Sequence, residues 1–190
     1  MTTSEITAER ISTARLRTPY VAMLSGVLAG LVNAVIARLL MRVVALVATG
    51  RGGFSILGTL NIFLFAILLG SVMGLGFGAI RRWLPGPPAV KGLLYSAILV
   101  VVFQIPVLLI VRDFAAEIMA VGTVGIAVFA LINLAYCQLL AHLYDYVDRR
   151  VPDTLSGGMI GGTVVLGLVA LTGLGVLVYE IGGRAVGLVR

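Results

Sequence analysis

The feature that most constrains this chain is a series of five apolar stretches, each close to or above the length of about 20 residues that a helix needs to cross a bilayer. They cover residues 20–44, 54–80, 91–111, 121–143 and 158–179. In hydrocarbon, only a helix or a closed barrel satisfies its own backbone hydrogen bonds, and stretches of this length match helices. The sequence therefore predicts an all-α integral membrane protein, a five-span transmembrane helix bundle.

Composition and charge agree with a chain that lies mostly in lipid. Of the 190 residues, 60% are apolar and 12% are charged, which leaves no room for a separate soluble domain. We expect a cytoplasmic segment over 1–18, with a helix on the membrane surface as one option, a single transmembrane domain over 19–180 and a short outer tail over 181–190. The net charge is +6, but the basic residues stand at span ends and not on one continuous face. The expected partner is therefore the lipid bilayer and not nucleic acid.

The distribution of basic residues predicts the orientation. With the N-terminus inside, eight basic residues lie on the cytoplasmic side and four outside when Arg38 and Arg42 are left out of the count: Arg10, Arg15, Arg17, Arg81, Arg82, Lys91, Arg149 and Arg150 against Arg51, Arg112, Arg184 and Arg190. Cytoplasmic loops carry the excess of Lys and Arg, so an N-in, C-out topology is predicted. The arginine-rich composition, with heavy use of Gly, Ala and Val, hints at a bacterial protein of the cytoplasmic (inner) membrane.

Small residues recur at four-residue spacing in three of the predicted spans. They are Ala22, Gly26, Gly30 and Ala34 in the first span, Gly70 and Gly74 in the second, and Gly158 and Gly162 in the last. A helical row without bulky side chains lets a second helix approach closely inside a membrane. We expect these rows to be helix-packing seams, which favours a homo-oligomer or a subunit of a larger membrane complex.

Two residues predict local features of the helices, a cap and a kink. The hydroxyl of Ser55 is expected to cap the second span. Pro106 lacks a backbone donor, so a kink near Phe103 is expected in the third.

Primary amides are the polar groups placed deepest in the predicted spans. Asn33, Asn61 and Gln104 fall at similar depth in the outer half of the membrane when a helix rises about 1.5 Å per residue, and Asn133 is a fourth candidate on the next span. Lipid cannot satisfy the donors and acceptor of an amide, so these side chains should face protein or trapped water. Two interpretations follow: hydrogen bonds between helices, or a polar solute path or binding pocket.

Arg38 and Arg42 follow the small-residue row of the first span near its outer end. Three interpretations are open for them. Their side chains reach lipid headgroups, or pair with the outer carboxylates of Asp113, Glu117 or Glu180, or receive an anionic ligand.

Reactive groups are scarce. His142 and Asp145 share one helical face with Arg149, so that Asp145 can meet either neighbour, but a charged helix end is ordinary at a membrane interface. One histidine and one cysteine supply neither a bis-histidine haem nor an ordinary zinc site, and Gly-x-Ser-x-Gly, His-Glu-x-x-His, Cys-x-x-Cys and phosphate-loop motifs are missing. We therefore expect no catalytic residues, no metal and no cofactor.

Three functions are compatible with this sequence. The first is a non-enzymatic subunit or oligomerising scaffold that uses the small-residue seams. The second is a small transporter or channel for an anionic or polar solute, in which the Asn/Gln layer and Arg38 with Arg42 form the path. The third, an intramembrane enzyme acting on lipid, needs convergent titratable groups around His142 and Asp145, and the sequence favours it least.

Overall fold

The computed structural model describes residues 3–49, 55–106, 123–153 and 155–185, and all regular structure in these ranges is helical. The elements are α1 (Thr3–Thr49), α2 (Ile56–Ile80), α3 (Pro88–Leu99), the π-helical turn η1 (Val100–Gln104), α6 (Thr123–Asp148) and α7 (Gly157–Ala185). The predicted all-α class is confirmed. Ser55 caps α2 as expected, because its Oγ accepts a hydrogen bond of 3.1 Å from the backbone N–H of Gly58.

Four of the described helices are long and apolar enough to cross a membrane: Leu16–Leu40 within α1, Ile56–Ile80, Ile126–Asp148 and Gly157–Val176. The third predicted span corresponds to α3 followed directly by η1, which together form the shorter apolar helix Pro88–Gln104. Residues 107–111, the rest of that prediction, lie outside the described residues. The chain is therefore an all-helical protein with four membrane-span candidates in its described part.

α1 is much longer than the predicted first span. It runs for 47 residues without a break and contains Pro19 in its interior. The helix therefore continues across the boundary that the sequence predicted between residues 18 and 19. At about 1.5 Å per residue its length is about 70 Å, more than twice the roughly 30 Å of a hydrocarbon core. Alanine, arginine, glutamate and leucine are good helix formers, and they allow the polar start of the chain to continue the same helix.

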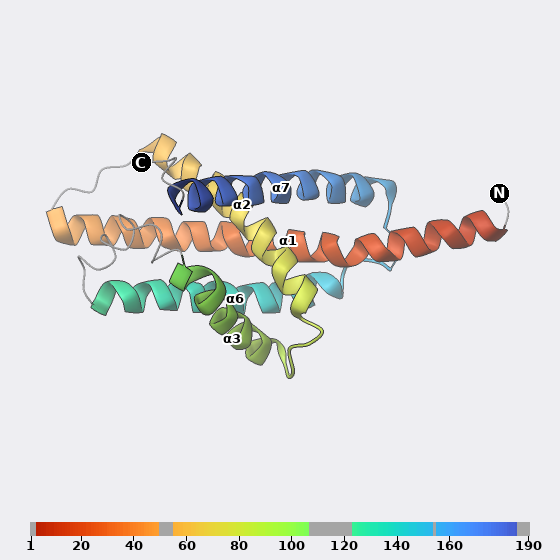
Figure 1. Cartoon of the computed structure of the whole chain (residues 1–190), viewed down its shortest axis with the longest axis horizontal. Helices are drawn as coiled ribbons and strands as arrows, with labels where there is room; N and C mark the ends of the chain where they lie inside the picture. Colours follow the sequence, from red (N-terminus) through yellow and green to blue (C-terminus); the bar gives the residue numbers. More distant parts are fainter. Residues whose placement is uncertain (1–2, 50–54, 107–122, 154, 186–190) are drawn as a thin grey trace.

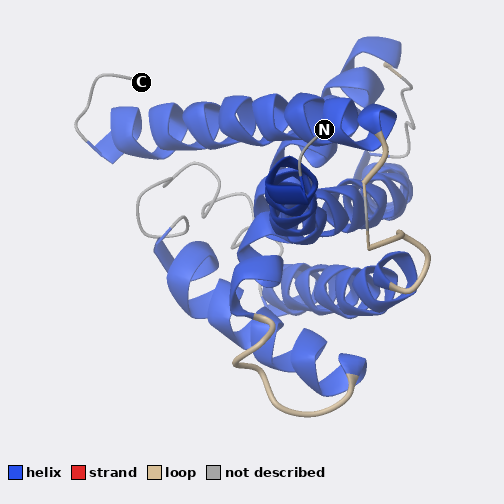
Figure 2. Ribbon diagram, turned by 90° about the vertical axis from the view of Figure 1, so that its right-hand side faces the viewer, coloured by secondary structure: helices blue, strands red, loops and turns tan. Residues whose placement is uncertain are grey.

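α1 is the central helix of the bundle. It lies between α7 on one side and α6 on the other, and α2 crosses it obliquely (Figures 1 and 2). α3 lies beside α6 on the side of the bundle away from α7. The first turns of α1 extend beyond the neighbouring ends of α6 and α7 (Figure 1).

The small residues of α1 and α2 meet along an antiparallel seam. A Cβ built on Gly70 would lie 2.5 Å from the carbonyl oxygen of Gly26, and one built on Gly26 would lie 2.8 Å from Cα of Gly74. On either side of this contact, Gly30 packs against the backbone of Ala66, and Gly74 packs against the backbone of Ala22. The two backbones touch directly, so this row is used for packing within one chain.

The glycines of α7 divide between two faces. A Cβ on Gly173 would lie 2.7 Å from the carbonyl oxygen of Leu68 in α2, and one on Gly162 would lie 3.4 Å from the ring of Tyr20 in α1. By contrast, a Cβ on Gly158 or Gly161 would meet no described atom within 4 Å. Of the two predicted packing glycines, Gly162 thus faces α1 and Gly158 faces open space.

An ionic cluster joins three helices at one end of the bundle. Arg17 of α1 donates to Asp148 Oδ1 at 2.7 Å and to its carbonyl oxygen at 2.6 Å, and Arg81 Nη1 lies 3.3 Å from Asp148 Oδ2. Arg81 also stacks over the ring of Tyr144, with its Cζ 4.1 Å from the centroid. Burial by itself lowers the pKa of Arg81, but the contacts with Tyr144 and Asp148 together raise it by more. The pKa of Arg81 is therefore above its ordinary value.

The predicted face of α6 is used differently from the expectation. Asp145 lies 3.9 Å from Arg81 Nη2, so its ionic contact is with α2 and not with Arg149 on its own helix. His142 Nδ1 lies 2.8 Å from the carbonyl oxygen of Gln138, one turn earlier. The reason is geometric: the last turns of α6 pack against Arg17, in the interior of α1, and against Arg81, at the C-cap of α2.

Candidate functional site: a pocket with four amides

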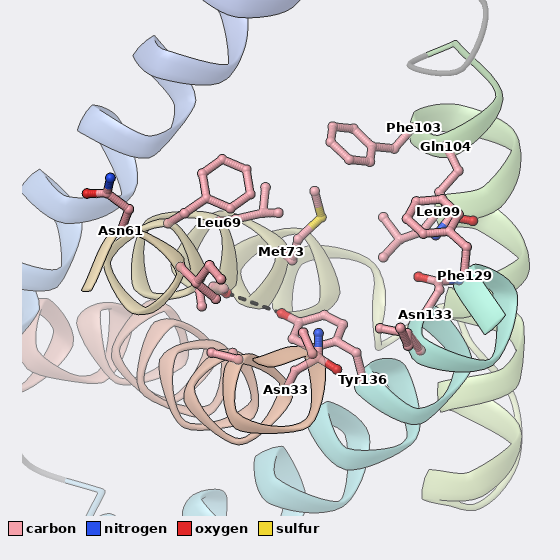
Figure 3. A pocket seen from close by; sticks show the side chains of 18 residues that line it. Asn33, Asn61, Leu69, Met73, Leu99, Phe103, Gln104, Phe129, Asn133 and Tyr136 are labelled. Carbon is pink, nitrogen blue, oxygen red and sulfur yellow. Dashed lines mark hydrogen bonds between the residues drawn. The ribbon is translucent and has the colours of Figure 1, made fainter. Parts of the chain in front are cut away.

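A pocket of about 440 Å³ lies between α1, α2, α3 with η1, and α6. Figure 3 shows the side chains that line it, and all four predicted amides are among them: Asn33, Asn61, Gln104 and Asn133. Asn33 lies 16 residues after Arg17, and Asn133 lies 15 residues before Asp148. At about 1.5 Å per residue, both amides are therefore more than 20 Å along the helices from the ionic cluster.

Small residues form the wall of the pocket that continues the seam. Gly30, Ala66 and Gly70 belong both to the α1–α2 contact and to the lining, and Ala34 and Ala37 extend the same wall along α1. Short side chains leave space once the two helices diverge, and a larger side chain here would fill it. The small-residue row of α1 thus has two consequences. It packs closely against α2 around Gly26, and it leaves space for the pocket at Ala34 and Ala37.

Aromatic and aliphatic side chains form the remaining walls. Phe65, Phe103, Phe129 and Tyr136 contribute rings, and Leu69, Met73, Leu99, Ile62 and Ile132 contribute aliphatic surface. The hydroxyl of Tyr136 points across the pocket to the carbonyl oxygen of Gly70 at 3.5 Å (Figure 3), the long limit of a hydrogen bond. Apolar walls with a few polar groups are typical of small-molecule sites.

The π-helical turn brings Phe103 and Gln104 to this pocket. In η1 the backbone N–H of Ile105 bonds to the carbonyl oxygen of Val100, five residues earlier. Pro106 follows at once and offers no backbone donor, so the regular α-helical pattern is already interrupted here. The sequence predicted a kink at this position, and the structure shows a π turn, a feature frequent at functional sites.

Asn133 is bound within the protein. Its Nδ2 donates to Ser96 Oγ at 2.8 Å and to the Ser96 carbonyl oxygen at 3.3 Å, and its Oδ1 accepts from Cys137 Sγ at 3.7 Å. Both Asn133 and Ser96 are buried. This amide therefore links α6 to α3.

The other three amides have no hydrogen-bond partner in the described part of the chain. Asn33 and Gln104 are half-buried and line the pocket from α1 and η1 (Figure 3), while Asn61 is exposed at its edge on α2. An amide at membrane depth cannot bond to lipid, so its donors and acceptor require a ligand or water. The pocket thus presents unused hydrogen-bonding capacity from α1, α2 and η1.

Charged side chains are absent from the described lining. Arg38 lies beyond the pocket on α1, where its Nη2 is 3.4 Å from the carbonyl oxygen of Ser55, and the side chain of Arg42 is exposed. Asp113 and Glu117 fall outside the described residues, as does the side chain of Glu180. The structure therefore brings the four predicted amides together but leaves the two arginines out of the site.

Several lining residues were not predicted, above all Tyr136 and the three phenylalanines. Aromatic residues are ordinary in transmembrane helices, and no sequence pattern distinguishes those that face a cavity from those that face lipid. Among the residues described, no group of three or more His, Cys, Asp or Glu side chains is placed to hold a metal ion.

Comparisons with models of protein families, with curated proteins and with solved structures found no match to this chain.

Proposed function

We propose that this protein binds a small molecule in the four-amide pocket and carries it across the membrane without catalysing a reaction on it. The observation that supports this most is the pair of amides, Asn33 and Gln104, that line the pocket without a described hydrogen-bond partner. Both side chains are half-buried, and their donors and acceptors remain available to a polar molecule or to water in the pocket.

The size and walls of the pocket support the same proposal. A volume of about 440 Å³ lies within the range of small-molecule sites. The sequence-based transporter hypothesis combined the amide layer with Arg38 and Arg42, and only the amides belong to the lining. We therefore propose a polar path that the amides form without Arg38 and Arg42.

Flux into vesicles tests this proposal. Purified protein is reconstituted into liposomes, and uptake of acetamide, chloride and phosphate is compared with protein-free liposomes. Ala37→Phe places a ring in the pocket, and Ala79→Phe, at an exposed position of α2 away from the lining, is the matched control. We expect at least one solute to move faster with protein, and only the Ala37 variant to lose that flux. Transport is refuted if no solute moves, or if both variants behave alike.

A second proposal is that the protein is a subunit of an oligomer, with α7 as the assembling face. The α1–α2 row is occupied within the chain, but a Cβ at five α7 glycines would meet no described atom within 4 Å: Gly157, Gly158, Gly161, Gly167 and Gly175. Small residues of this kind permit a second helix to approach. Gly161→Leu should shift the mass in detergent from oligomer to monomer, whereas Leu93→Ala, at an exposed position of α3 away from α7, should not. A wild-type protein that is monomeric at all concentrations would contradict this.

We further propose five spans in an N-in, C-out topology in a bacterial cytoplasmic membrane. α3 and η1 together hold 17 residues. At about 1.5 Å per residue their combined length is about 26 Å, which is close to the hydrocarbon thickness and supports their assignment as a fifth span. Single cysteines at Ser4 and Arg184 in a Cys137→Ser background test this with an impermeant maleimide. Label at position 184 in intact cells, and at position 4 only after lysis, is expected. Equal labelling of both sites would refute it.

A further inference from the structure

We infer that the ligand of the pocket is a neutral molecule with a ring-sized apolar body and a group that both donates and accepts hydrogen bonds, of which a primary carboxamide is the simplest example. This inference rests on the proposed function of the pocket and specifies its ligand. Three properties of the lining support it: the lack of charge, the chemistry of the unpaired groups and the shape of the walls.

The first property, the lack of charge in the described lining, disfavours an ionic ligand. The described lining holds amides, one phenol, aromatic rings and aliphatic groups, and no charged side chain. Moving an ion to this depth without a counter-charge is costly, because neither lipid nor apolar side chains replace its water. The nearest basic residue along α1, Arg38, contacts the carbonyl oxygen of Ser55 and is not part of the lining. A carboxylate or phosphate would therefore bind weakly.

The second property sets the polar group. Asn33 and Gln104 each offer two N–H donors and one carbonyl acceptor, and both are without a described partner. A ligand that only accepts, such as an ether, leaves the acceptors unused, and one that only donates leaves the N–H groups unused. A carboxamide matches both, since it presents the same donors and acceptor in return.

The third property sets the body of the ligand. Phe103 and Gln104 come from the same π turn, so the turn contributes both a ring and an amide to the lining (Figure 3). Phe65, Phe129 and Tyr136 add rings from α2 and α6. Aromatic rings pack favourably edge-to-face or offset against another ring. A ring beside the carboxamide would use both features together.

Three probes with one body and different polar groups test the inference: 4-hexylbenzamide, 4-hexylbenzoate and hexylbenzene. Binding is measured to the whole protein in lipid nanodiscs, with empty nanodiscs subtracted for partition into lipid. The single cysteine, Cys137, is fully buried, so a fluorogenic maleimide that reacts on thermal unfolding gives an independent readout. We expect the benzamide to bind about tenfold more tightly than either other probe, the difference that one or two net hydrogen bonds supply.

Gln104→Leu keeps a side chain of similar size and removes the amide. It should reduce benzamide affinity about tenfold and leave that of hexylbenzene unchanged. Asn33→Leu provides the same test from α1 should the first variant fail to fold. Thr172→Val, at an exposed position of α7, is the matched control, because the Thr172 hydroxyl bonds only to Leu168 one turn earlier among the described contacts.

The outcomes separate this inference from the proposed function. Equal binding of benzamide and hexylbenzene, or tighter binding of the benzoate, overturns the ligand class but leaves a binding pocket. The absence of binding by all three probes, together with no flux of any solute in vesicles, overturns both. Selective benzamide binding that is lost in Gln104→Leu or Asn33→Leu, and kept in Thr172→Val, supports the ligand class. Together with flux in vesicles it supports the proposed function as well, and without flux it overturns transport but leaves a carboxamide-binding pocket.

Discussion

Gly26 of α1 and Gly70 of α2 face each other with their backbones in contact, so that a Cβ added to Gly70 would lie 2.5 Å from the carbonyl oxygen of Gly26. A real Cβ cannot remain at that distance from a backbone atom, so the helices must separate. The same separation would disturb the wall of the pocket, because Gly70 belongs to it.

Gly26→Leu is therefore expected to lower the free energy of unfolding by more than ordinary overpacking does, which costs about 1–3 kcal/mol. The loss is larger because the backbone, and not only a side chain, must move. Gly167→Ala is the control, because a Cβ there meets no described atom within 4 Å. Reaction of Cys137 with a maleimide during heating reports unfolding. Equal transition temperatures for the two variants would show that the seam does not hold the helices together.

The ionic cluster gives a second prediction. Asp148 bonds to both Arg17 and Arg81, and about a quarter of each side chain is exposed, so screening by water limits its contribution. Asp148→Asn should cost about 1 kcal/mol of stability, and the loss should shrink at high salt. Asp153→Asn should have no measurable effect, because that carboxylate is 98% exposed and 3.6 Å from Arg17 Nε. Thermal unfolding at two salt concentrations decides between these expectations.

The bond between Asn133 and Ser96 is expected to be a true coupling between α6 and α3. A double-mutant cycle with Asn133→Leu and Ser96→Ala should give a coupling free energy of about 0.6 kcal/mol, the average for interhelical hydrogen bonds in membranes, and no more than about 1.7 kcal/mol. The single variants and the double variant are compared by reversible unfolding in detergent. Strict additivity would mean that the two side chains do not interact.

Replacing Asn33 should not lower the stability of the fold, whereas replacing Asn133 should. Since Asn33 has no hydrogen-bond partner in the described chain, Asn33→Leu should leave stability unchanged or raise it by up to about 1 kcal/mol, because an unpaired amide is removed from an apolar region. The measurement is the same unfolding transition without added ligand. A clear loss of stability would indicate that Asn33 supports the fold and does not serve the pocket.

The sequence was sufficient to predict the helical class, the Ser55 cap and the Ile80 end of α2, and the irregular backbone before Pro106. These depend on local chemistry: hydropathy, a capping hydroxyl and a missing backbone donor. It also singled out the four amides, because an amide in lipid requires a partner wherever the helix lies. The continuity of α1 through Pro19 was not predicted, since a proline signals a boundary in most contexts.

Contacts between distant helices were beyond sequence reasoning. The spacing of Asp145 and Arg149 suggested a pair on one helix, but Arg81 of α2 lies next to Asp145 in space and provides the contact. The small-residue row likewise indicated a packing seam without indicating its partner. Only the placement of α2 across α1 shows that Gly70 and Gly74 fill that role.

The contacts of α1 also imply an order of events during synthesis. Every residue of the α1–α2 seam precedes residue 80, so the first two helices can form a hairpin while the rest of the chain is still being made. Asp148 follows Arg81 by 67 residues, and until it emerges the two arginines lack this carboxylate. The closing of the bundle at that end is thus a late step, and a ribosome stalled before α6 would leave a hairpin whose charged end is still exposed.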